Sequence, residues 1–142
     1  MSGMTIALLS GVLMSVQGVF NIEVTRQTSL WVSSAFVQFT ALLACLAAWI
    51  FTDQSSFLAI GHVEPKYMLL SGVAGALITA TVIKSMEALG PARAAMLIVL
   101  AQLAAAYLIE LMGWFGVEKQ SFLWRRVIGL GIMAVGVVLF KW

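Results

Sequence analysis

The chain has 142 residues, of which 62% are hydrophobic and 10% are charged, and its formal net charge is +2. Soluble globular domains carry about 25% charged residues, so this composition excludes them and indicates a membrane protein. The few cations form no basic stripe, which excludes nucleic acid as a partner and leaves the lipid bilayer as the expected surroundings.

Five apolar stretches follow one another along the chain, and each is close to the ~20 residues that a helix needs to cross ~30 Å of hydrocarbon. They cover residues 4–25, 31–51, 66–88, 93–113 and 124–141. The longest segment between them, residues 52–65, is too short to fold by itself. The sequence therefore predicts an all-α integral membrane protein, with residues 1–142 forming a single domain of five transmembrane helices.

Amide side chains interrupt three of these apolar stretches. Gln17 and Asn21 lie four residues apart in the first stretch, hence on one helix face. Gln38 is near the centre of the second stretch, and Gln102 is near the midpoint of the fourth. An unbonded amide is costly in hydrocarbon, so these groups should face protein or a water-filled cavity. They either line a substrate path or form interhelical hydrogen bonds worth ~0.6–2 kcal/mol each, the second interpretation being favoured for Gln38.

Small residues recur every four positions on the third stretch, at Ser71, Gly75 and Thr79, and the fifth stretch contains three glycines. Small side chains allow helix backbones to approach closely in a membrane. The pattern favours helix packing over substrate contact.

Lysines and arginines are divided evenly between the two sides of the membrane. Five crossings place Lys66, Lys119, Arg125 and Arg126 on the side of the N-terminus, and Arg26, Lys84, Arg93 and Lys141 on the opposite side. Orientation in the membrane normally follows an excess of Lys and Arg in the cytoplasmic loops. Equal numbers on the two sides therefore favour neither orientation strongly. We expect chains inserted in both orientations that pair head to tail, unless one or two charges dominate by position.

Ionisable residues gather at two places. Glu23, Arg26, Lys84, Glu87 and Arg93 form a cluster on the side opposite the N-terminus, in which two i,i+3 pairs of opposite charge predict interfacial ion pairs.

The second place is Glu110, which lies one turn from the end of the fourth stretch with no cation within a turn. An unpaired carboxylate inside the membrane is a candidate proton carrier or cation site. Arg125 or Arg126, at the start of the fifth stretch, offers the alternative of neutralising it.

Catalysis has little support. His62 is the only histidine and Cys45 the only cysteine, and no phosphate-binding glycine motif occurs. The sequence therefore predicts no enzyme activity, no metal site and no cofactor.

Three segments, in order, carry a resemblance that extends over nearly the whole chain. They are Gln17-Gly18-Val19-Phe20-Asn21, Leu89-Gly90-Pro91-Ala92, and the run from Gln102 through Glu110 to Gly113 and Gly116. With them the chain resembles the YdcZ-like branch of the drug/metabolite transporter superfamily, half-length bacterial membrane proteins of about five spans. It departs from the family pattern at Ala101, where glycine is usual, and at Glu110, where aspartate is usual.

The resemblance implies half of a transporter. Larger members of the superfamily have ten helices in two inverted repeats, which a five-helix chain could reproduce as an antiparallel dimer. The implied function is secondary transport of a small organic solute, with or without protons, across the bacterial inner membrane. Gln17, Asn21, Gln102 and Gln38 would bind the substrate, and Glu110 would couple transport to a gradient. The alternatives are a non-transporting membrane interaction protein and one subunit of a heterodimer with a sibling chain.

Overall fold

The computed structural model describes residues 2–141, and in that range the chain is helical with no strand. The five α-helices are α1 (Gly3–Gln27), α2 (Leu30–Thr52), α3 (Ser71–Leu89), α4 (Pro91–Met112) and α5 (Trp124–Lys141). Short 3-10 helices η1 (Phe57–His62), η2 (Lys66–Leu70) and η3 (Trp114–Gly116) lie in the connections. The all-α prediction is confirmed, with one difference: the third apolar stretch begins as η2 before it becomes α3.

Local chemistry explains where the helices begin and end. The Ser29 hydroxyl accepts a hydrogen bond from the Val32 N–H and caps the start of α2. Gly90 has φ +83°, which a glycine adopts without strain, and Pro91 then occupies the first turn of α4. Gly113 ends α4 in the left-handed conformation at φ +67°. These caps turn the chain sharply between long apolar helices.

Within residues 2–141, four helical segments are long and apolar enough to cross a membrane: Gly3–Gln27, Leu30–Thr52, Lys66–Leu89 and Pro91–Met112. In the apolar 18-residue window of each span, at most 11% of the residues are buried inside the chain. A soluble monomer rarely exposes so much contiguous apolar surface, so this surface requires lipid or a partner. At 18 residues, α5 is roughly 27 Å long and carries basic residues at its ends.

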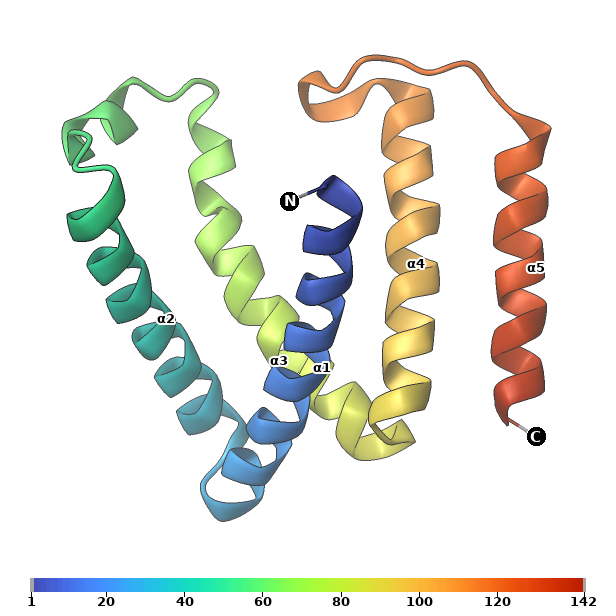
Figure 1. The fold of residues 1–142 in the computed structure, drawn as a ribbon, viewed down its shortest axis with the longest axis horizontal. Helices are drawn as coiled ribbons and strands as arrows, with labels where there is room; N and C mark the ends of the chain where they lie inside the picture. The colour runs from blue at the N-terminus through green and yellow to red at the C-terminus, as the bar shows by residue number, and fades with distance from the viewer. Residues whose placement is uncertain (1, 142) are drawn as a thin grey trace. The chain divides into compact units, whose positions relative to one another are not determined.

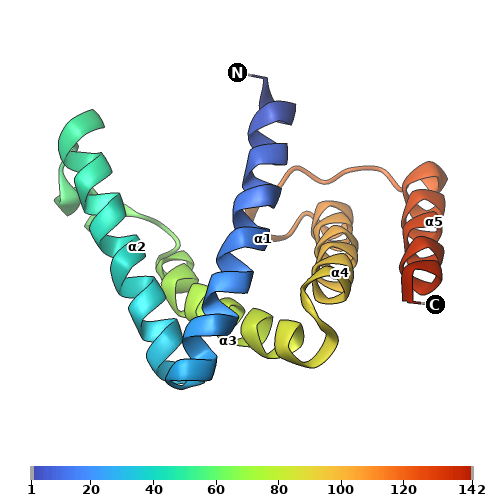
Figure 2. The same cartoon turned by 60° about the horizontal axis from the view of Figure 1, so that its bottom comes forward.

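The chain divides into two compact units, one ending at Glu87 and the other beginning at Ala88, within the last turn of α3. In the first unit, α1 and α2 meet at the turn after Gln27 and diverge from it like the arms of a V (Figures 1 and 2). In the second unit, α4 and α5 run side by side and antiparallel (Figure 1).

Close packing in the first unit depends on Gly18 of α1. A Cβ atom at this position would stand 2.5 Å from the Met86 Sδ atom and 2.7 Å from its Cε atom. Met86, on α3, is buried. The absent side chain of Gly18 therefore provides the space that the thioether of Met86 fills.

We expect Gly18→Leu to destabilise the protein by about 1–3 kcal/mol, because the larger side chain overpacks this contact. Gly18→Ala should be much milder, since the flexible end of Met86 can move and alanine favours a helix by about 1 kcal/mol over glycine. Thermal unfolding of the purified protein in detergent measures both. Adding Met86→Ala should restore part of the loss in Gly18→Leu, and a Gly18→Leu protein as stable as the wild type would contradict this packing.

Candidate functional site

A groove of about 670 Å³ lies between the diverging helices α1 and α2. It is mainly apolar, with a few polar side chains among its walls. The lining residues are Ser10, Leu13, Met14, Val16, Gln17, Phe20 and Asn21 of α1, with Val37, Thr40, Ala41 and Ala44 of α2. An apolar concavity with few polar groups is the usual form of a small-molecule site.

Asn21 is the polar side chain that distinguishes this groove. The residue is 6% exposed, and its backbone carbonyl accepts a hydrogen bond of 3.3 Å from the hydroxyl of the buried Ser33 on α2. This bond joins the two helices near the vertex of the V. The side-chain amide of Asn21 has no hydrogen-bond partner among residues 2–141, although it lines the groove. The atoms of this amide are not among the buried side-chain atoms that lack a partner, which are Thr25 Oγ1 and Ser34 Oγ in the described residues. The amide therefore stays accessible, and it can bond to water or to a ligand in the groove.

Gln17 lies one turn before Asn21 and lines the same groove, so the two amides share a face of α1. Its side chain is exposed. Two hydroxyls of the lining are already engaged: Ser10 donates to the Ile6 carbonyl, and Thr40 donates to the carbonyls of its own helix. The groove therefore offers two amides as its free hydrogen-bond donors.

Gln38 has a different environment. Its amide nitrogen donates to the Thr79 hydroxyl on α3 at 3.3 Å, and that hydroxyl donates to the Gly75 carbonyl at 3.0 Å. Gln38 is not among the residues that line the groove. Its contacts match the helix-packing alternative, and a Cβ on Gly75 would stand 3.7 Å from the Gln38 amide nitrogen. The small residues of α3 therefore admit a side chain from α2.

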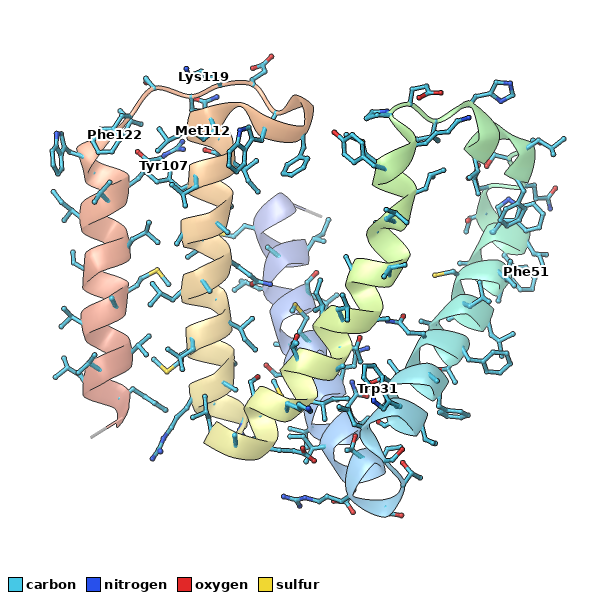
Figure 3. The ribbon with its side chains drawn as sticks, turned by 180° about the vertical axis from the view of Figure 1, so that it is seen from behind. Trp31, Phe51, Tyr107, Met112, Lys119 and Phe122 are labelled. Atoms are coloured by element: carbon cyan, nitrogen blue, oxygen red, sulfur yellow. The ribbon has the colours of Figure 1, made fainter. Side chains whose placement is uncertain are left out.

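In the second unit, the end of α4 is fastened to the start of α5. Arg126 Nη1 donates to Glu110 Oε2, and the Arg126 guanidinium lies 5.6 Å from the centre of the Tyr107 ring. The Leu123 N–H donates to the Tyr107 hydroxyl at 2.9 Å, and that hydroxyl donates to the Leu123 carbonyl. Figure 3 shows Tyr107 and Phe122 close together at this end of the two helices.

Glu110 and Arg126 also line a smaller groove of about 300 Å³ whose other residues, apart from Tyr107, are apolar. The side chains of the ion pair are 38% and 44% exposed, respectively. Of the two arginines that the sequence offered as partners, Arg126 is the one that reaches Glu110. The carboxylate is thus paired with a cation from α5, while it stays accessible from the groove.

Comparison with protein families adds the evidence for identity. Residues 2–139 match the family DMT_YdcZ, described as "Putative inner membrane exporter, YdcZ". The chain belongs to this family. Neither the curated proteins nor the solved structures gave a match.

Membership, together with the apolar helices, makes the chain a multi-pass protein of the inner membrane. The family description supports a role in transport, and an exporter is not a class of enzyme. Within residues 2–141, no three His, Cys, Asp or Glu side chains gather where they could hold a metal ion.

Only part of the predicted interfacial charge cluster forms ion pairs. Glu23 and Arg26 approach to 3.8 Å, and Gln27 donates to the Glu23 carboxylate at 2.8 Å. The expected pair of Lys84 and Glu87 is not formed; the ion pairs found among residues 2–140 are Glu23–Arg26 and Glu110–Arg126. Both side chains of the missing pair are exposed, and ordering two long side chains in water offsets their attraction. Arg93, on α4, belongs to the other unit.

Gln102 is exposed on α4 and forms no side-chain hydrogen bond within the part of the chain that the structure describes. It is not among the residues that line either groove described above. Gln102 belongs to the second unit, whereas Gln17 and Asn21 belong to the first.

Sequence reasoning missed Ser33 and the Tyr107–Leu123 clamp. Ser33 stands next to Ser34 near the start of a mainly apolar stretch, and this pair of small polar residues was a usable signal for close helix contact. The clamp joins a side chain to backbone atoms 16 residues away. No spacing pattern predicts such a contact.

Proposed function

We propose that the chain is half of a secondary transporter, which moves a small organic solute by alternating access at the interface of an antiparallel dimer. The observation that carries the proposal is the amide of Asn21, which lines a groove between two membrane helices and has no hydrogen-bond partner among residues 2–141. An amide in that position can form hydrogen bonds with a ligand or with water. During alternating access, the groove would hold the ligand in one part of the cycle and water in another, so the amide would have a partner in both.

Dimerisation is supported by the open side of the groove and by the exposed apolar surface of a single chain. The groove between α1 and α2 has walls from these two helices alone, and most of each span is exposed. A second copy in the opposite orientation would complete the enclosure and supply the inverted repeat that transporters use. The four-against-four balance of Lys and Arg allows both orientations.

This account requires α5 to cross the membrane as a fifth span. Arg125 and Arg126 stand at its start, where long cationic side chains can extend to the headgroups. The segment between Arg126 and Lys141 is apolar throughout. An odd number of spans places the two ends of each chain on opposite sides.

Flux into proteoliposomes tests the proposal. A panel of radiolabelled solutes that spans sugars, amino acids, amides and organic ions should contain one with saturable uptake that empty liposomes lack. Asn21→Leu should abolish that uptake, while the matched control Thr81→Val, which removes a polar group from α3 outside the groove, should retain it. Helix packing without transport, the competing function, predicts no saturable flux for any solute.

Gln102 gives a separate prediction, because its exposed amide has no bond within the chain to lose. Gln102→Leu should therefore fold and unfold like the wild type. If the residue lines the path, transport disappears while the dimer persists; if it bonds to a second copy, the dimer weakens by up to ~2 kcal/mol. Size-exclusion chromatography and flux together measure both properties, and unchanged flux in a well-assembled variant would remove Gln102 from the site.

A further inference from the structure

We infer that the groove between α1 and α2 selects an uncharged amphiphile, recognised by hydrogen bonds from Asn21 and Gln17 and not by an ion pair. The inference rests on the proposed function, since it names the substrate class of that site. It is drawn from the chemistry of the lining residues.

The lining of the groove contains no ionisable side chain. All of its residues are aliphatic, aromatic, thioether, hydroxyl or amide groups. The nearest acidic residue along α1, Glu23, lies outside the lining, and its carboxylate already accepts from Gln27 and approaches Arg26. A charged ligand that moves from water into this groove would therefore find no counter-ion. The free-energy cost of that transfer is far greater than for a neutral polar group.

The polar groups that remain free specify hydrogen bonding in both directions. Each amide has two N–H donors and one carbonyl acceptor. The hydroxyl hydrogens of Ser10 and Thr40 are used on their own helices, so these side chains can only accept. A ligand group that both donates and accepts, such as a carboxamide or a hydroxyl, satisfies Asn21 and Gln17 together.

The apolar walls specify the remainder of the ligand. Phe20 and Met14 of α1 and Val37 of α2 line the same groove as the amides. An aromatic ring packs well against phenylalanine, and a methionine thioether adapts to irregular shapes. A small molecule with one polar end and one aromatic or aliphatic end fits this arrangement.

Three probes of nearly equal shape test the inference: phenylacetamide, which is neutral, phenethylammonium, which is a cation, and phenylacetate, which is an anion. Binding is measured as thermal stabilisation of the full chain in nanodiscs. Phenylacetamide should stabilise the protein at concentrations about 100-fold lower than either ion, because only the ions must leave water unpaired. Asn21→Leu should weaken phenylacetamide binding about tenfold, the loss expected for one hydrogen bond.

A charge substitution in the same place sharpens the test. Asn21→Asp keeps the size of the side chain and adds a carboxylate, so phenethylammonium should become the best of the three probes. Thr81→Val, the matched control outside the groove, should keep the wild-type order. Equal or stronger stabilisation by an ion in the wild type, or no stabilisation by any probe, would overturn the inference.

Measuring flux of the same probes separates this inference from the proposed function. Binding of phenylacetamide without flux would count against transport and leave the neutral site standing. Saturable flux of phenethylammonium would support transport and overturn the neutral site, and the second copy would then supply the counter-charge.

Discussion

Replacing Glu110 by glutamine should abolish gradient-driven accumulation of the transported solute and leave assembly intact. The glutamine oxygen can still accept a hydrogen bond from Arg126, so the contact between α4 and α5 keeps its shape. It can no longer ionise, however, and coupling requires a group that gains and loses a proton or exchanges it for a cation. Slow downhill exchange should persist, because the groove between α1 and α2 does not contain Glu110.

The comparison uses proteoliposomes with an imposed proton gradient for accumulation, and counterflow without a gradient for exchange. Glu110→Asp keeps the charge and should retain at least part of the accumulation. Arg126→Gln tests the ion pair from the other side, since a coupling carboxylate must be released from its partner during the cycle. Accumulation by Glu110→Gln at the wild-type rate and with the wild-type pH dependence would remove the coupling role. The residue would then be an interfacial anchor for α5.

Two lysines added to the loop before α5, as Gln120→Lys with Ser121→Lys, should force nearly all chains into one orientation. The balance of Lys and Arg is a tie, so two further charges on one side decide it. Chains of a single orientation cannot form an antiparallel pair with themselves, and flux should fall to the level of empty liposomes. Reporter fusions at the C-terminus measure orientation, and cross-linking measures assembly.

A complementary variant provides the control for this prediction. Lys119→Gln with Arg125→Gln removes one cation from the same loop and one from the start of α5, and it biases the chain the other way without touching the Glu110–Arg126 pair. Each variant alone should be inactive, and co-expression should restore assembly and flux. Full activity of either variant expressed alone would contradict an antiparallel homodimer.

The helices were predictable from the sequence because each depends on local information: a long apolar run with a cap or a turn at its end. The start of the third helix was less predictable. The 3-10 helix at Lys66–Leu70 is as apolar as the α-helix after it, so composition does not mark the boundary between them. That Gln17 and Asn21 share a face followed from helical spacing alone. The helices, and the helix face that carries these two amides, could thus be predicted from the sequence.

The partners of the polar residues were not predictable, because each one comes from a different helix. Gln17 and Gln38 are both glutamines in apolar stretches, yet Gln17 lines an open groove and Gln38 bonds to Thr79. Glu110 had two possible arginine partners, and Arg126 is the one that pairs with it. These partners depend on how the helices pack against one another in three dimensions, which cannot be read from one stretch of sequence.

Accessibility of one loop position from both sides of the membrane tests the antiparallel arrangement most directly. Cys45→Ala removes the only cysteine, and Ser121→Cys then places a single thiol in the loop before α5. An impermeant maleimide applied to intact spheroplasts, and separately to inverted vesicles, should label a substantial fraction of the chains in each case. Labelling from one side only would contradict the antiparallel homodimer and the mechanism of transport built on it.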